Sequence, residues 1–290
     1  MMTQATPGPK AAVIGKPIAH SRSPLIHGYW LRTYGLPGSY GRVLVEPEDL
    51  PVFLRDLAAN GYAGCNVTIP HKEGAFAACA SHTPTAAALG AVNTLWFEDG
   101  MLWGDNTDVL GYQASLDAAA PGWSDNVRCA RLLGAGGAAR AIVFGLAERG
   151  VRRIEIANRS EDRAAALSQD LAPLAARFGA SLEVIGWDRR DAGLAGVQHL
   201  VNTTSLGMVG QPPLEIDLAG LPEGAIVFDA VYVPLVTPLL ARAKARGLVV
   251  ADGLDMLLHQ ARPGFERWFG RAPQVTEELR RLAEADLAGA

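Results

Sequence analysis

The second half of the chain contains the segment "RLLGAGGAARAIVFGLAERG", residues 131–150, which carries the clearest indication of its fold. A short apolar run leads into Gly134, Gly136 and Ala139, and apolar residues at helical spacing follow. In a strand–turn–helix unit the first glycine permits the tight turn, the second lets a pyrophosphate approach the backbone, and a small third residue allows close packing. The start of the helix also offers free N–H groups to phosphates. In this context the stretch predicts a dinucleotide-binding unit rather than a plain tight turn.

The residues after the next strand indicate which dinucleotide binds. Units that bind NAD place Asp or Glu about 20 residues past the glycines, on a ribose hydroxyl. Here Asn158 lies 24 residues after Gly134 and is followed by Arg159. A guanidinium pairs with a 2′-phosphate that a carboxylate would repel, so the pattern predicts NADP. Arg163, four residues later, shares a helix face with Arg159, although a solvated surface charge remains the alternative for both.

The rest of the chain alternates short apolar runs with helical patterns, which is typical of βαβ units and parallel sheets covered by helices on both faces. Before residue 121 we expect strands over 11–15, 40–46 and 63–69, a hairpin over 91–104, and helices over 24–35, 48–61 and 107–120. After residue 150 we expect strands over 152–160, 181–187, 196–204, 225–231 and 248–253, and helices over 161–178 and 238–247. A domain boundary is expected near Asp108. Residues 254–290 look helical, with a break at Pro263-Gly264.

The composition narrows the function classes. The chain has 290 residues, 49% apolar and 19% charged, with a formal net charge of −4, which argues against a nucleic-acid-binding protein. No apolar run approaches the roughly 18 residues that a membrane span needs, and the N-terminus has no secretory pattern. Cys65, Cys79 and Cys129 are scattered, so neither a disulfide framework nor a metal site is expected. A reducing cytoplasm fits this pattern.

A candidate anion site lies in "GKPIAHSRSPLIHGYW", residues 15–30. Ser21 and Ser23 precede Pro24, a residue favoured in the first turn of a helix. Ser23 is then the natural N-cap, which remains compatible with anion binding at a helix end. Ser21 has no evident capping role. Two hydroxyls in this position suit a carboxylate.

Two further stretches carry candidate catalytic groups. In "NVTIPHK", residues 66–72, a strand ends and a proline precedes Lys72 at the start of a helix. In "GDNTD", residues 104–108, Asn106 and Thr107 read as a cap of the next helix, whereas Asp108 is either a first-turn acid or a catalytic carboxylate. Physical reasoning alone leaves both readings of Asp108 open, and it leaves Lys72 open as a solvated surface lysine.

Taken in order, the motifs resemble those of one family. "KPIAHSRSPLIH", "NVTIPHK", "GAVNT", "GDNTD", "GAGGAAR", "NTTSLGM", "DAVYVPLVTPLL" and "DGLDMLLHQA" are similar to shikimate dehydrogenase over nearly the whole chain. The resemblance implies NADP-dependent, reversible reduction of 3-dehydroshikimate to shikimate in aromatic amino-acid biosynthesis. It also implies two α/β domains with a cleft between them. The substrate domain would comprise 1–108 plus 253–290, and the Rossmann-like NADP domain 109–252.

The resemblance assigns roles residue by residue. It implies a catalytic pair formed by Lys72 and Asp108, and no metal. The substrate-binding positions that it implies are Ser21, Ser23, Asn66, Thr68, Asn93, Tyr232 and Gln260. The cofactor-binding positions are Gly134, Ala135, Gly136, Gly137, Ala138, Asn158, Arg159, Ser160, Arg163, Thr203, Ser205, Ala230, Gly253 and Met256.

The chain departs from the family pattern at Gly28 and at Arg262-Pro263. Neither departure touches the catalytic motifs, but both leave open a relative that prefers quinate or an aminated ring. One alternative is therefore a quinate/shikimate dehydrogenase that uses NAD or NADP. Another is a nucleotide-sensing module without catalysis, against which the retained Lys72 and Asp108 argue. The expected assembly is a monomer or a homodimer.

Overall fold

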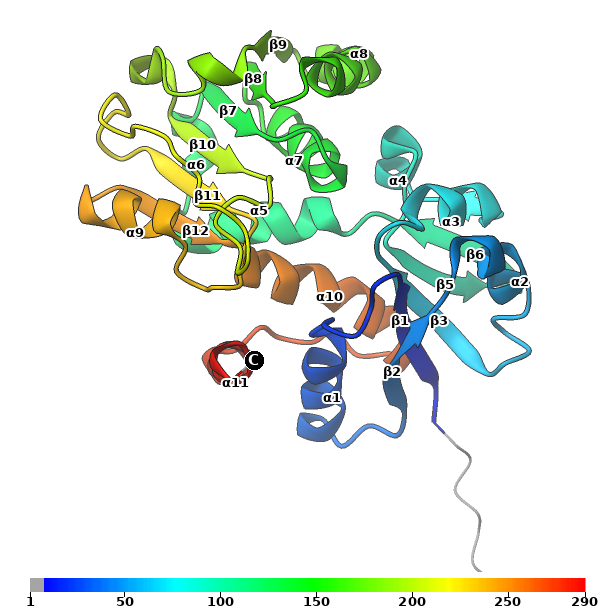
Figure 1. The fold of residues 1–290 in the computed structure, drawn as a ribbon. Coiled ribbons are helices and arrows are strands. Elements are labelled where there is room, and N and C mark those ends of the chain that lie inside the picture. Colours follow the sequence, from blue (N-terminus) through cyan, green and yellow to red (C-terminus); the bar gives the residue numbers. More distant parts are fainter. Residues whose placement is uncertain (1–7, 290) are drawn as a thin grey trace, which may run out of the picture. The chain divides into compact units, whose positions relative to one another are not determined.

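The computed structural model describes residues 8–289, and the chain divides into two compact units (Figure 1). The first unit contains the residues up to Thr107 together with Gln260–Ala283, and the second contains Asp108–His259 and the residues from Glu284 onward. The chain passes from the first unit to the second between Thr107 and Asp108, and helix α10 (Gly253–Phe269) begins in the second unit and ends in the first.

The first unit is built on a six-stranded sheet in the order β2-β1-β3-β5-β6-β4. Its strands are β1 (Lys10–Gly15), β2 (Ser39–Leu44), β3 (Tyr62–Val67), β4 (Ser81–His82), β5 (Thr94–Glu98) and β6 (Met101–Asp105). The strands β2, β1 and β3 run parallel to one another, whereas β5 is antiparallel to both β3 and β6. The parallel strands agree with the expected βαβ units, and the antiparallel pair β5–β6 is the expected hairpin.

The antiparallel part of the sheet follows from the predicted hairpin. Asp99 and Gly100, between β5 and β6, have φ values of 51° and 77°. Two consecutive positive φ angles match the two-residue turn whose twist suits a hairpin. The local turn therefore reverses the chain, and β6 pairs directly with β5.

The helices of the first unit are mostly short. They are α1 (Ser23–Thr33), the 3₁₀ helix η1 (Pro47–Asp49), α2 (Leu50–Arg55), α3 (Lys72–Ala78) and α4 (Pro84–Leu89). The single helix expected over 48–61 is wrong, because α2 ends at Arg55 and the chain turns through Gly61 at φ 77° into β3. Buried apolar side chains from β1, β3, β5, α2 and α3 form one core, which includes Ile14, Leu54 and Leu95.

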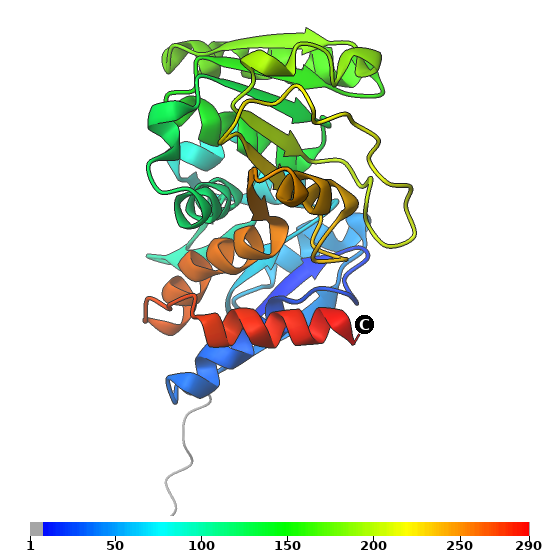
Figure 2. The ribbon, with the colours of Figure 1, turned by 90° about the vertical axis from the view of Figure 1, so that its left-hand side faces the viewer.

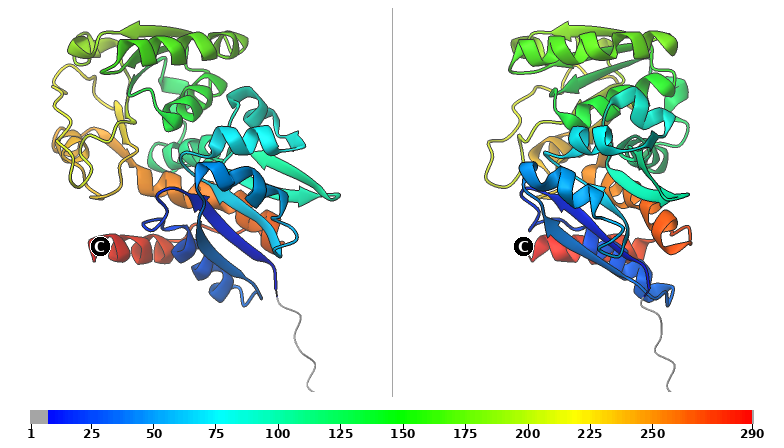
Figure 3. Two further views of the ribbon diagram at one scale, coloured as in Figure 1. Left: turned by 45° about the vertical axis from the view of Figure 1, so that its right-hand side comes forward. Right: turned by 90° about the vertical axis from the view of Figure 1, so that its right-hand side faces the viewer.

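The expected break at Pro263 is also wrong. The helix α10 runs without interruption from Gly253 to Phe269, with Pro263 inside it. A proline removes one backbone donor, but the residues that follow are held firmly by packing: Phe265 is fully buried, and the indole of Trp268 donates a 2.9 Å hydrogen bond to the carbonyl of Leu95. Figure 3 shows this end of α10 (orange) against the sheet of the first unit.

The last helix, α11 (Glu277–Ala288), lies beside α1, as Figure 2 shows. The hydroxyl of Tyr29 donates to the carboxylate of Glu278 at 3.1 Å, and the indole of Trp30 donates to the carbonyl of Gln274 at 2.8 Å. The helix α1 and the segment Gln274–Glu278 thus pack together within the first unit.

The second unit is a fully parallel sheet in the order β12-β11-β10-β7-β8-β9. Its strands are β7 (Cys129–Leu133), β8 (Arg153–Ala157), β9 (Ser181–Ile185), β10 (His199–Asn202), β11 (Ile226–Asp229) and β12 (Val249–Asp252). The first strand of the unit, β7, lies between β8 and β10, so the strand order reverses there. This is the doubly wound order in which ligands bind at the carboxyl ends of the strands on either side of the reversal. The fold expected for this half is confirmed.

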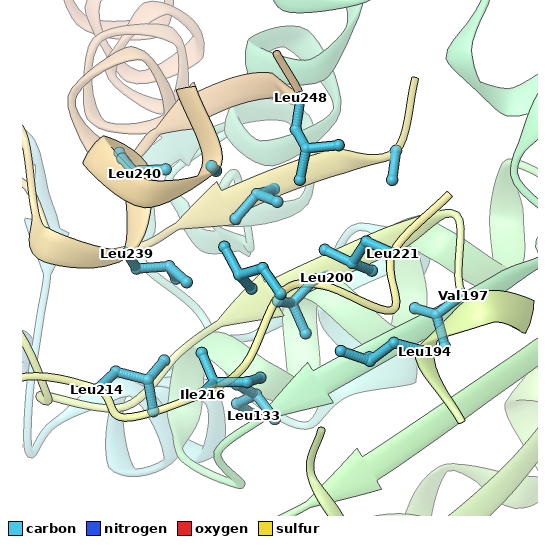
Figure 4. Packing of buried hydrophobic residues seen from close by; sticks show 14 of the residues in the cluster. Leu133, Leu194, Val197, Leu200, Leu214, Ile216, Leu221, Leu239, Leu240 and Leu248 are labelled. Atoms are coloured by element: carbon cyan, nitrogen blue, oxygen red, sulfur yellow. The ribbon is translucent and has the colours of Figure 1, made fainter. Parts of the chain in front are cut away.

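Helices cover both faces of this sheet (Figure 1). They are α5 (Asp108–Ala119), α6 (Trp123–Asn126), α7 (Gly137–Glu148), α8 (Glu161–Arg177) and α9 (Pro238–Ala245), with the 3₁₀ helices η2 (Trp187–Arg189) and η3 (Leu194–Gly196). Figure 4 shows the core beneath α9, where Leu239 and Leu240 meet strand residues such as Leu200 and the connecting segment at Leu214 and Ile216. Among residues 8–289, no helix is both long and apolar enough to cross a membrane.

Candidate active site

The serine loop before α1 is arranged differently from the expected cap. The helix α1 begins at Ser23, the residue before it is Arg22, and no side chain caps the helix. Instead, the backbone N–H of Ser23 donates to the hydroxyl oxygen of Ser21 at 3.3 Å, and the two hydroxyl oxygens are 3.3 Å apart. The capping role that the sequence assigned to Ser23 is therefore wrong, and Ser21 is the residue that supports the start of the helix. The two hydroxyls do lie together, as a carboxylate site requires.

A basic residue that sequence reasoning missed holds this loop. Arg42, on β2, donates from Nε and Nη2 to the carbonyl oxygen of Ser21, at 2.9 and 2.5 Å. Both contacts fix the position of the Ser21 backbone. They also place the positive charge of Arg42 on the main chain of the serine loop. The available signal was the alternation on β2, where Tyr40 and Arg42 point to the same side of the sheet.

The carboxyl ends of β1 and β3 lie in close contact. A Cβ at Gly15 would overlap the methyl group of Thr68, so only glycine fits beside that side chain. The backbone N–H of Thr68 donates to the carbonyl of Ile14 at 2.9 Å. Thr68, half-buried, follows β3 at the edge where an open α/β sheet binds ligands.

Lys72 is the first residue of α3 and is half-buried. Its backbone carbonyl accepts a 3.0 Å hydrogen bond from Val92, and the preceding residue, His71, is buried with its Nε2 2.8 Å from the carbonyl of Val45. The positive end of a helix dipole disfavours a lysine in the first turn. The contacts with Val92 and the buried His71 fix the backbone of Lys72 at this position.

Three of the expected substrate-binding residues belong to one buried polar network. The side-chain nitrogen of Asn66 donates to the carbonyl of Asn93 at 3.2 Å and to the hydroxyl of Thr94 at 3.1 Å. The side-chain nitrogen of Asn93 lies 3.4 Å from Oε1 of Gln260. Although residues 93 and 260 are far apart in the sequence, α10 brings Gln260 to this network.

Thr107 connects the network to Asp108. Its backbone N–H donates to Oδ1 of Asn93 at 2.8 Å, and its hydroxyl donates to the carbonyl of Gln260 at 2.8 Å. The expectation that the Thr107 side chain caps α5 is therefore wrong. Asp108 is the next residue, half-buried in the first turn of α5, where the helix dipole favours its negative charge. Lys72 and Asp108 belong to different units.

The glycine turn of the second unit has the geometry that a pyrophosphate needs. Gly134 has φ 108°, and a Cβ there would lie 2.6 Å from the hydroxyl oxygen of Thr203. At Gly136 and Gly137 a Cβ would meet no atom within 4 Å. No side chain caps α7, which begins at Gly137. Open space at an uncapped helix start suits a bound phosphate group.

The loops after β10 and β11 lie at the same edge of the sheet as the glycine turn. Thr203 donates from its backbone and from its hydroxyl to the carbonyl of Leu133, at 2.7 and 2.9 Å, so it lies beside the glycine turn. Ser205 is exposed in the same loop. A Cβ at Gly253 would overlap the carbonyl group of Ala230, which explains why a glycine begins α10.

Two further candidate binding residues, Tyr232 and Met256, lie in a loop and in a helix of the second unit. Tyr232 is half-buried in the segment between β11 and α9, and Met256 is buried in α10. Tyr232 therefore lies in the second unit, whereas the other expected substrate-binding residues lie in the first.

The segment expected to read the 2′-phosphate follows β8. The side-chain nitrogen of Asn158 donates to the carbonyl of Ser160 at 2.7 Å, which closes a tight turn before α8. Arg159 and Arg163 are exposed. Arg159 follows the carboxyl end of β8, a strand that pairs with β7, and Arg163 lies in the first turn of α8.

Sequence reasoning missed a buried carboxylate that shapes the loops after β10 and β11. Asp229 is fully buried and accepts hydrogen bonds from Asn202 at 2.8 Å, from Thr237 at 2.6 Å and from the backbone of Val231 at 3.0 Å. Burial raises the pKa of Asp229, while these hydrogen bonds oppose the shift. The sequence signal was the pair of polar residues that end two apolar strands, "LVN" and "VFD".

Comparison with known proteins identifies the family. Residues 13–95 match the model of the shikimate dehydrogenase substrate binding domain, and residues 253–281 match that of the shikimate 5'-dehydrogenase C-terminal domain. A protein of Azorhizobium caulinodans named shikimate dehydrogenase (NADP(+)) is 55% identical over 279 residues, which cover 96% of this chain and 97% of that protein.

Solved structures agree. A shikimate 5-dehydrogenase from Thermus thermophilus, in complex with NADP(H) and shikimate, is 35% identical with a TM-score of 0.79, covering 94% of this chain and 99% of that one. A quinate dehydrogenase from Corynebacterium glutamicum, in complex with NAD, is 28% identical with a TM-score of 0.86, and the match covers 97% of this chain and 99% of that one. Given 55% identity to a named member over nearly the whole length, this chain belongs to the shikimate dehydrogenase family.

Proposed function

We propose that this protein catalyses the NADP-dependent, reversible reduction of 3-dehydroshikimate to shikimate, a step of chorismate and aromatic amino-acid biosynthesis. The observation that carries the proposal is the buried network of the first unit. It brings together Asn66, Asn93 and Gln260, side chains suited to the hydroxyls of a polyhydroxylated ring.

The substrate carboxylate is assigned to Ser21 and Ser23. Their hydroxyl oxygens are 3.3 Å apart, and each can donate a hydrogen bond to one carboxylate group. Arg42, bonded to the carbonyl of Ser21, adds a favourable charge. Thr68 and Tyr232 are assigned further contacts with the ring substituents.

The chemistry is assigned to Lys72 and Asp108. When bound, NADPH supplies the hydride that reduces the ring carbonyl carbon. Lys72 stabilises the negative charge that develops on the carbonyl oxygen and donates a proton to it. Asp108 accepts hydrogen bonds from the lysine and from an adjacent ring hydroxyl, which orients both. In the reverse direction the same pair receives the hydroxyl proton.

The cofactor is assigned to the second unit. The open space at Gly136 and Gly137 and the uncapped start of α7 fit the pyrophosphate. Arg159, with Asn158, Ser160 and Arg163, is assigned to the 2′-phosphate and adenosine ribose. Cofactor contacts are further assigned to the backbone and side chains at Ala135, Ala138, Thr203, Ser205, Ala230, Gly253 and Met256. We further propose a cytoplasmic location, which the three free thiols support, and a monomeric or homodimeric state.

The second candidate function is quinate oxidation with NAD, which the similarity to the Corynebacterium glutamicum enzyme favours. Absorbance of reduced nicotinamide, followed with shikimate or quinate and with NADP or NAD in all four pairings, decides between the two. We expect the highest kcat/KM for shikimate with NADP. A higher kcat/KM for quinate with NAD would replace the first function by the second, and no turnover in any pairing would overturn both.

A further inference from the structure

Thr94 joins the two amide side chains of the substrate network. Its side chain is only 1% exposed, at the start of β5. Its hydroxyl oxygen is 3.1 Å from the side-chain nitrogen of Asn66 and 3.0 Å from Oδ1 of Asn93. An amide nitrogen only donates and a hydroxyl has a single proton. Thr94 therefore accepts from Asn66 and gives its own proton to Asn93.

A neighbouring hydroxyl does not change this assignment. The hydroxyl oxygen of Thr107 also lies 3.2 Å from that of Thr94 and 3.0 Å from Oδ1 of Asn93, but its shortest contact is with the carbonyl of Gln260 at 2.8 Å. A carbonyl only accepts, so the proton of Thr107 points to Gln260. Of the two acceptors then within reach of the proton of Thr94, Oδ1 of Asn93 at 3.0 Å is nearer than the hydroxyl oxygen of Thr107 at 3.2 Å.

The consequence for Asn66 is that it meets a ligand with its oxygen. Both of its N–H donors are used inside the unit, one by the carbonyl of Asn93 and one by Thr94. Its Oδ1 receives a 2.6 Å hydrogen bond from the hydroxyl of Tyr40, which opposes a flip of the amide. A ligand hydroxyl can meet Asn66 only at Oδ1, and only as a donor.

The consequence for Asn93 is the opposite. Its Oδ1 accepts the backbone N–H of Thr107 at 2.8 Å and the hydroxyl of Thr94 at 3.0 Å, which uses both lone pairs. Any ligand contact of this side chain therefore falls to its amide nitrogen, which donates. The two asparagines present opposite polarity.

We propose that Thr94 is a positioning residue that sets this polarity, so that the site selects a ring with a hydroxyl that donates to Asn66 and an oxygen that accepts from Asn93. The inference rests on the proposed function. It adds the specificity rule that replacing the donating hydroxyl of the ring by a methyl ether removes recognition at Asn66, because the ether has no proton to donate.

The test compares Thr94→Val, which keeps the shape and removes the hydroxyl, with Thr94→Ser, which keeps the hydroxyl. Substrates are shikimate and its singly O-methylated derivatives, with NADP. An unsatisfied buried donor costs enough to change an equilibrium by about five- to a hundredfold. We expect Thr94→Val to raise the KM for shikimate at least about fivefold and to leave the KM for NADP unchanged. We also expect a smaller preference ratio, which is kcat/KM for shikimate divided by kcat/KM for the O-methylated derivative that the wild type uses least. Thr94→Ser should restore both KM and preference.

The preference ratio is measured on folded, active enzyme, so a mere loss of stability does not move it. The inference is overturned if Thr94→Val keeps the wild-type ratio, or if Thr94→Ser behaves like Thr94→Val. Failure of the proposed function is a separate result, because it shows as absence of shikimate turnover in the wild type.

Should Thr94→Val not fold, Tyr40→Phe tests the same polarity at Oδ1 of Asn66. We expect the KM for shikimate to rise about two- to tenfold, the range for loss of one neutral hydrogen bond. Tyr62→Phe is the matched control, because the ring of Tyr62 packs against Phe53 and Lys10 at the other end of β3. An equal effect of the two phenylalanine variants, or no effect of Tyr40→Phe, would contradict the inference.

Discussion

Arg159→Ala should lower the affinity for NADP and leave the affinity for NAD almost unchanged. Arg159 follows the end of β8 and is exposed, and within residues 8–289 it makes no hydrogen bond or ion pair. Its removal therefore breaks no contact that holds the fold. Surface changes of this kind alter stability by less than about 0.5 kcal/mol, so a change in cofactor binding can be read directly.

The size of the effect follows from this exposure. A hydrogen bond to a charged group contributes about 1.5–3 kcal/mol, and solvent around an exposed guanidinium screens the interaction. The lower end applies, about 1.5 kcal/mol, which corresponds to about a tenfold loss in affinity for NADP. NAD lacks the 2′-phosphate, so the same variant should change its affinity less than about twofold.

The assay is the dissociation constant of each cofactor, measured by titration calorimetry on wild type and variant at low and at high salt. The loss for NADP should shrink as salt rises. Arg163→Ala, which removes the other exposed arginine assigned to this region, on α8, should lower the affinity for NADP less than about threefold. Equal losses for NADP and NAD, or a larger loss for Arg163→Ala, would refute the assignment of the phosphate to Arg159.

Lys72→Ala should lower kcat at least about a hundredfold, the lower range for a positioned acid–base group. In the double variant, Asp108→Asn should lower kcat little further. If the steady-state rates show that the two losses multiply, the two residues act independently. Arg42→Met should raise the KM for shikimate without changing that for NADP, because it releases the backbone of Ser21; an unchanged shikimate KM would show that the loop holds its position without the arginine. Burial lowers the pKa of His199 to about 4, so below pH 6.5 the unfolded chain binds a proton that the folded chain excludes. The free energy of unfolding is then highest above pH 6.5 and should fall by about 1.3 kcal/mol between pH 7.5 and 5.5. Urea titrations at both pH values measure this fall. If His199→Gln shows the same fall as the wild type, other groups cause it.

Local signals in the sequence were sufficient for much of the fold. The glycine turn at Gly134, the hairpin at Asp99-Gly100 and the strands of the second unit were all predicted, because each depends on spacing and backbone preference within a few neighbouring residues. Family membership was predicted from the order of the motifs and is confirmed by the comparisons. The roles of individual site residues and the exact domain limits stay predictions.

Local rules failed where a distant part of the chain decided the outcome. The rule for helix caps chose Ser23, but the hydroxyl of Ser21 and the guanidinium of Arg42 determine how that loop lies. The rule for proline predicted a break at Pro263, but the packing of Trp268 against the first sheet outweighs one missing donor.

Hydrophobic period and turn chemistry act locally, so they are enough to show which residue types stand at the ends of the strands. The direction in which those side chains face depends instead on contacts made across the folded unit. Asn66 lies next to Tyr40, Asn93 and Thr94, and Thr107 lies next to Gln260, 153 positions away along the chain. A buried hydroxyl or amide takes its direction from whichever partner satisfies it, and in this network most of those partners are brought together only when the strands and α10 pack.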